Sequence, residues 1–135
     1  MSAGTLDETS TFTPGEKSER VEHVMSDPHA EALFHALFQT TLPYEKRWPG
    51  TDNDSLQTRT LRIPFHRITA PTLILHGDKD GDVPIEDSDY TAAHIRGAEH
   101  HRASDEDHLG FWLSPKSADL QHVVRTFLHR HATRQ

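Results

Sequence analysis

Two polar segments in the second half of the sequence contain side chains suited to acid–base chemistry. Residues 77–84 (GDKDGDVP) supply three aspartates, and residues 104–112 (SDEDHLGFW) supply His108. An aspartate that accepts the Nδ1 hydrogen of a histidine fixes the tautomer of the imidazole and leaves Nε2 available as a general base. The sequence therefore indicates an acid–histidine pair, provided that the fold brings the two segments together.

The elements around these segments predict that they meet. Residues 72–76 are a short apolar run that proline precedes and glycine ends, which is typical of a strand covered on both faces of a parallel sheet. We expect a helix over residues 87–95, a second strand over residues 98–103, and a last helix with Ser114 as its N-cap. The order strand–helix–strand–helix indicates α/β layering, in which neighbouring parallel strands place their C-terminal loops at one edge of the sheet.

The first half of the sequence predicts helices. Thr13 and Glu16 have the spacing of a capping box, and Asp27 before proline repeats the start signal. An apolar stripe with helical periodicity follows, formed by Ala30, Leu33, Phe34, Leu37 and Phe38. Residues 43–60 predict an ordered loop or a short broken helix, because they contain a Pro-Gly pair. These patterns divide the chain into a flexible N-terminal segment (1–13), a helical part (14–60) and an α/β part (61–135).

Residues 68–131 resemble the C-terminal end of the α/β-hydrolase fold. The resemblance rests on ITAPTLILHGDKDGDVP, which is similar to the family's strand and acid loop, and on DEDHLGFW, which is similar to its histidine loop. It implies the last two strand–helix units of the parallel sheet, with residues 14–60 as helices left from a cap. It also implies that Asp80 is the catalytic acid, with Asp82 as the fallback, and that His108 is the catalytic histidine.

The resemblance implies hydrolysis of an ester- or amide-type carbonyl substrate by a Ser-His-Asp triad. The family's nucleophile stands on a Gly-x-Ser-x-Gly turn, and none of the nine serines has glycine two residues before it. Asp52 is the only aspartate so placed, and position 54 is not glycine. We therefore expect these 135 residues to hold the acid and the histidine but not the nucleophile. The alternatives are a non-catalytic remnant or oligomerisation module with exposed core surface, and a histidine-rich metal-binding protein.

Composition narrows the classes of partner. Fourteen basic and 21 acidic side chains give a net charge of −7, which disfavours nucleic acid and anionic membranes as partners. The sequence has no cysteine, no long apolar stretch and no recognisable secretory signal, so we expect a cytoplasmic protein. Of the large aliphatic residues and phenylalanines, residues 1–60 hold 10 and residues 61–135 hold 18. The second part is therefore expected to form the core.

We expect no cofactor and no resident metal ion. The spacings of His94, His100, His101 and His108 match no closed metal-binding motif. The aspartates of residues 77–84 lack the later glycine and glutamate of a calcium loop. Two kinds of partner remain. One is a small carbonyl substrate, if the missing half of the fold supplies the nucleophile, and the other is a further copy of the chain.

Overall fold

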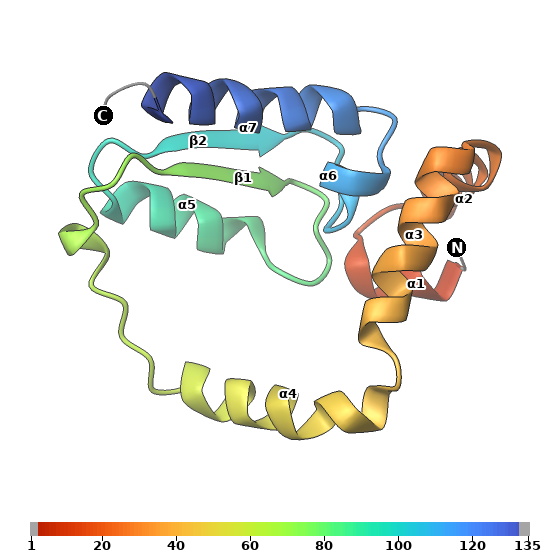
Figure 1. Cartoon of the computed structure of the whole chain (residues 1–135), viewed down its shortest axis with the longest axis horizontal. Helices are drawn as coiled ribbons and strands as arrows, with labels where there is room; N and C mark the ends of the chain where they lie inside the picture. The colour runs from red at the N-terminus through yellow and green to blue at the C-terminus, as the bar shows by residue number, and fades with distance from the viewer. Residues whose placement is uncertain (1–2, 133–135) are drawn as a thin grey trace.

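The computed structural model describes residues 3–132 and consists of helices around a small parallel sheet (Figure 1). The elements, in chain order, are α1 (Ala3–Thr9), α2 (Pro14–Ser26), α3 (Pro28–Thr41), α4 (Tyr44–Thr58), a 3₁₀ turn (Phe65–Arg67), β1 (Leu73–Gly77), α5 (Ile85–His94), β2 (Glu99–Ala103), α6 (Gly110–Leu113) and α7 (Ser117–Ala132). None of the described helices is long and apolar enough to cross a membrane.

The two strands form the parallel pair that the sequence predicted. Leu73 of β1 pairs with Glu99 of β2, and Gly77 pairs with Ala103. Helices α5 and α7 lie on opposite sides of the strands (Figure 1), and Gly97, with a φ of 75°, turns the chain between α5 and β2. Because the strands run in the same direction, the loops after Gly77 and Ala103 leave the same edge of the sheet.

Helices α2 and α3 begin where the sequence predicted. Thr13 caps α2 in a complete capping box with Glu16, and the Asp27 carboxylate accepts the first free amides of α3. The apolar faces of these helices meet α6: Val24, Ala30 and Leu113 form a buried cluster, with Leu33, Phe34 and Leu109 packed against it. Helices α2 and α3 thus pack against the segment that follows His108.

Within the N-terminal segment (1–13), where the sequence predicted no helix or strand, the structure has a helix. Residues 3–9 form α1, in which the Leu6 side chain is fully buried, and Phe12 is also buried. Two large apolar residues among polar ones give no periodic pattern, although each finds a place in the core. Residues 1–2 lie outside the described residues.

Of the two alternatives predicted for residues 43–60, the helix is the one that forms, but it is longer than expected and continues through Pro49: α4 has 15 residues. Tyr44 and Trp48, one helical turn apart, lie with their ring centroids 5.7 Å apart, a contact that supports the first turns of the helix. No residue of α4 is buried, and the helix stands apart from the sheet (Figure 1).

The last helix begins later than predicted. Ser114 follows α6, and α7 begins at Ser117, although the Ser114 hydroxyl accepts the Lys116 amide at 2.9 Å in the manner of a cap. Leu120 and Phe127 of α7 are buried, whereas Leu128 is exposed. The described sheet has only two strands, which is too narrow to bury the whole apolar face of α7.

Candidate active site

Asp80 is fixed by the turn that follows β1. Its Oδ1 accepts the backbone amides of Asp82 and Val83, both at 2.8 Å, and its side chain is only 6% exposed. Burial alone raises the pKa of this carboxyl, but the Val83 amide, the His108 imidazole and the Asp82 amide together lower it below its usual value. Asp80 is therefore an ionised carboxylate at neutral pH.

The structure brings Asp80 and His108 together from the two loops. His108 Nδ1 lies 2.9 Å from Asp80 Oδ2. Because an ionised carboxylate only accepts hydrogen bonds, the hydrogen of this contact belongs to Nδ1. Asp82, the fallback acid, lies on the other side of the ring, with its Oδ2 3.6 Å from His108 Nε2. Asp80 thus contacts the Nδ1 side of the imidazole, and Asp82 lies near its Nε2 side.

A second histidine, which the sequence analysis did not single out, contacts the same carboxylate. His76 Nε2 lies 3.0 Å from the Val83 carbonyl oxygen and 3.2 Å from Asp80 Oδ2. Both neighbours are acceptors, so the hydrogen of the neutral His76 ring is on Nε2. His76 thereby ties the last turn of β1 to the acid loop. The sequence could have pointed to His76, because it ends the predicted strand directly before Gly77 and the aspartates of the acid loop.

The acid loop and the histidine loop are in close backbone contact. The Lys79 amide donates to the Glu106 carbonyl at 2.9 Å, and the Asp78 amide donates to the Ala103 carbonyl at 3.0 Å. A Cβ at Gly77 would overlap with the Glu106 carbonyl oxygen, so only glycine allows this approach. The relative position of Asp80 and His108 is therefore set by main-chain contacts as well as by their own hydrogen bond.

The N-terminal segment contacts both loops. The Thr9 carbonyl accepts the amides of His108, at 3.1 Å, and Gly81, at 3.2 Å. Ser10 pairs with Asp80 in an antiparallel bridge. Nothing in the sequence indicated this contact, because it depends on backbone groups that any residue provides.

A cavity of about 330 Å³ opens beside the pair. It is lined by Asp80, His108 and His76 and by the apolar side chains Leu75, Phe111 and Trp112, among others. None of its lining residues is a serine, threonine or cysteine. The cavity can present an oriented imidazole to an external group, and it supplies no nucleophile of its own.

No protein-family model matches the sequence, and no curated protein matches it. Among solved structures, the fold is similar to an alpha/beta hydrolase fold protein from Nakamurella multipartita, with a TM-score of 0.80 and 32% sequence identity. The match covers 93% of this chain and 44% of that protein. This chain is therefore part of an α/β-hydrolase fold.

The partial α/β-hydrolase fold spans less than half the length of its structural neighbour. Within it, Asp80 and His108 stand after neighbouring parallel strands and touch through Nδ1, as expected from the sequence. Asp52, the aspartate considered for the nucleophile position, lies on exposed α4. Within residues 3–132, no three histidine, aspartate or glutamate side chains gather as they would around a metal ion.

Proposed function

We propose that this chain supplies the acid and the histidine of an α/β-hydrolase that cleaves an ester- or amide-type carbonyl substrate. The contact of 2.9 Å between His108 Nδ1 and Asp80 Oδ2 carries the proposal. In this reaction a serine attacks the carbonyl carbon while Nε2 of His108 takes the serine proton and later returns it to the leaving group. Asp80 holds the Nδ1 hydrogen and stabilises the imidazolium that forms.

The nucleophile of this reaction comes from polypeptide outside the 135 residues. No serine stands in a Gly-x-Ser-x-Gly sequence, and the cavity beside His108 is lined by no hydroxyl or thiol side chain. A triad without its nucleophile retains little of its rate, because its members act as a unit. The partners in this proposal are thus a nucleophile-bearing polypeptide and a small carbonyl substrate, and the chain alone hydrolyses esters very slowly.

The tautomer of His108 tests the acid–histidine pair in the chain itself. In ¹⁵N NMR spectra recorded above the imidazole pKa, His108 of the wild type is expected as the Nδ1–H tautomer. In Asp80→Asn the side-chain amide can donate to Nδ1, so the ring is expected to change to the Nε2–H tautomer. An unchanged tautomer in Asp80→Asn, or an Nε2–H tautomer in the wild type, would contradict the proposal.

Reconstitution tests the activity. The chain is co-expressed with the polypeptide encoded immediately upstream of it, and the purified complex is assayed with p-nitrophenyl esters. We expect hydrolysis that falls at least ~1,000-fold in His108→Ala. The matched control is His94→Ala, since His94 is an exposed histidine of α5 that bonds and stacks on Tyr90 and does not line the cavity beside His108. Equal losses in the two variants would contradict the role of His108.

A non-catalytic interaction module is the second candidate. It is favoured by large apolar side chains that lie at least 40% exposed, including Phe38, Trp48, Leu56, Leu61 and Trp112. A stable oligomer of the chain alone, with no activity in the reconstituted complex, would favour this candidate over the hydrolase.

A further inference from the structure

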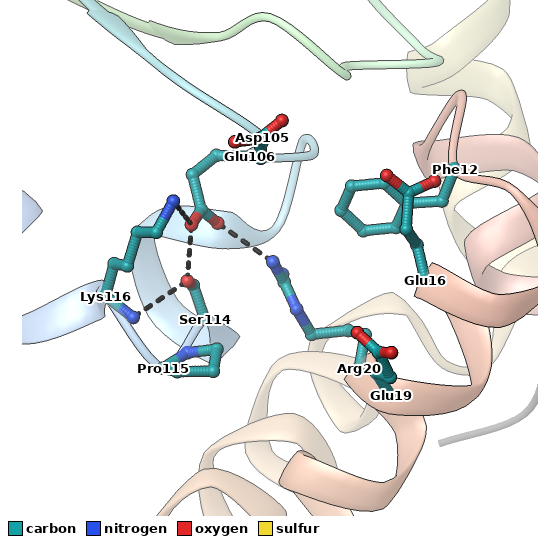
Figure 2. A pocket seen from close by; sticks show the side chains of 9 residues that line it. All are labelled: Phe12, Glu16, Glu19, Arg20, Asp105, Glu106, Ser114, Pro115 and Lys116. Carbon is teal, nitrogen blue, oxygen red and sulfur yellow. Dashed lines mark hydrogen bonds and ion pairs between the residues drawn. The ribbon is translucent and has the colours of Figure 1, made fainter.

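A buried charged cluster joins α2 to the loop that carries His108 (Figure 2). Arg20 Nη1 donates to Asp107 Oδ1 at 2.7 Å, and Arg20 Nη2 donates to Glu106 Oε2 at 2.9 Å. The Arg20 side chain is 6% exposed, and those of Glu106 and Asp107 are 3% and 0% exposed. The three charges are thus almost entirely removed from water.

The surroundings of the cluster hold Glu106 from its other side. The Ser114 hydroxyl donates to Glu106 Oε1 at 2.7 Å, and the Lys116 ammonium lies 3.9 Å from the same oxygen. The Arg20 guanidinium lies over the Phe12 ring, 5.2 Å from its centroid. These side chains line a cavity of about 280 Å³. Figure 2 shows them, with Arg20 pointing toward Glu106.

Burying three charges carries a large desolvation penalty, so the cluster stabilises the fold less than an apolar contact of the same size would. What it supplies is geometry: a planar guanidinium binds two carboxylates in one orientation. Those carboxylates belong to the two residues directly before His108. Glu106 is also closely packed against Gly110, because a Cβ at Gly110 would lie 2.5 Å from Glu106 Oε2.

We infer that Arg20 is a positioning residue for His108: its two bonds to Glu106 and Asp107 hold the histidine loop so that the imidazole meets Asp80. The orientation of the acid–histidine pair therefore depends on α2, in which Arg20 precedes its partners Glu106 and Asp107 by 86 and 87 residues. The contacts of Arg20 support the positioning of the His108 imidazole, and the use of that imidazole in catalysis rests on the proposed function.

Hydrogen exchange at His108 tests this inference in the full chain. The readout is the exchange rate of the Nδ1 hydrogen with water, measured by ¹⁵N-resolved NMR. In Arg20→Met we expect exchange at least ~10-fold faster than in the wild type, because the loop is no longer held. The matched control is Arg130→Met: Arg130 forms a bond of 2.6 Å to Glu99 between exposed side chains on α7 and β2, and its loss is expected to leave His108 unchanged.

A second variant covers the case in which Arg20→Met does not fold. The triple variant Arg20→Met/Glu106→Gln/Asp107→Asn removes all three buried charges and keeps the shape of the two acidic side chains, so no unpaired carboxylate remains. It is also expected to exchange His108 Nδ1–H at least ~10-fold faster. Wild-type exchange in either folded variant would overturn the role of Arg20 while leaving the proposed function intact. An unchanged His108 tautomer in Asp80→Asn overturns the proposed function instead.

Discussion

At the scale of single residues, the Asp80 carboxylate is the organising group of the site. Two backbone amides bind one of its oxygens, and the imidazoles of His108 and His76 lie at the other. A carboxylate with this many donors is held in one orientation, because turning it would break several bonds at once. The orientation of His108 therefore follows from that of Asp80, and the contact of His76 with Asp80 connects the acid loop to β1.

Asp80 should make the stability of the chain sensitive to acid. Hydrogen bonds outweigh burial and hold its pKa below the ordinary value of 3.8, so its stabilising contribution is complete above pH 3.8 and is lost as the pH falls through the folded-state pKa. Asp80→Asn is expected to lower the free energy of unfolding by about 1–3 kcal/mol near pH 7 and by much less in strong acid. Urea titrations between pH 2.5 and pH 7 measure this difference.

The control for this prediction is Asp52→Asn on exposed α4, whose free energy of unfolding should stay within about 0.5 kcal/mol of that of the wild type throughout. Asp107 has the opposite effect on the pH dependence of stability. Burial outweighs the attraction of Arg20 and raises the pKa of Asp107, so its contribution to the free energy of unfolding falls as the pH rises above 3.8. A constant difference between Asp80→Asn and the wild type across the pH range would contradict the assignment of the acid sensitivity to Asp80.

Gly77 should tolerate no side chain. Because a Cβ there would overlap with the Glu106 carbonyl, Gly77→Ala must push the acid loop and the histidine loop apart. We expect a loss of about 1–3 kcal/mol or more in the free energy of unfolding, measured by urea denaturation. Gly50→Ala is the matched control, since nothing lies within 4 Å of a Cβ at Gly50. Equal effects of the two substitutions would show that the approach of the loops is not tight.

At the scale of elements, the sequence was informative where local patterns determine structure. The caps at Thr13 and Asp27 and the strands on either side of α5 follow from short-range rules, and the 28-residue separation of Asp80 and His108 fits the crossover between them. These elements placed the pair correctly. The cluster of Arg20 with Glu106 and Asp107 could not be predicted in this way, because its partners are 86 and 87 residues apart and charged residues give no apolar pattern.

Helix α4 was predicted only as a short broken helix or a loop, because the Pro-Gly pair at positions 49 and 50 was expected to interrupt it, and the helix continues through that pair. It has no buried residue to stabilise it, and a proline inside a helix costs about 3 kcal/mol. An isolated helix of 15 residues is marginal in water even without proline. Its stability must therefore be the lowest of the long helices unless another surface covers it.

Hydrogen–deuterium exchange should show this difference between elements. Amides of α4 are expected to exchange at least ~100-fold faster than those that pair β1 with β2, because local opening of α4 exposes no core. Pro49→Ala should slow the exchange of α4 and increase the helical circular dichroism signal. Protection of α4 equal to that of the sheet, in the chain alone, would mean that another copy of the chain covers it.

At the scale of the whole molecule, the exposed apolar surface and the charge oppose each other. A two-stranded parallel sheet leaves strand edges open, and large apolar side chains are exposed on α3, α4 and α6. A net charge of −7 at pH 7 resists association of copies through this surface. The 12 histidines make that resistance dependent on pH, because an ordinary histidine gains its charge near pH 6.5.

Self-association of the chain alone should therefore pass through a maximum near the sequence pI of 5.9. At pH 8 repulsion between negatively charged copies favours smaller species, and at pH 4.5 the charge has reversed. Sedimentation velocity at pH 8.0, 5.9 and 4.5, in 0.15 M salt, measures the average mass. The double variant Tyr44→Ser/Trp48→Ser, which removes exposed aromatic rings from α4, should lower the maximum without moving it along the pH axis. A mass independent of pH would mean that a specific interface dominates. A maximum unchanged in the double variant would place the contact outside Tyr44 and Trp48, on the other exposed apolar side chains or the open strand edges.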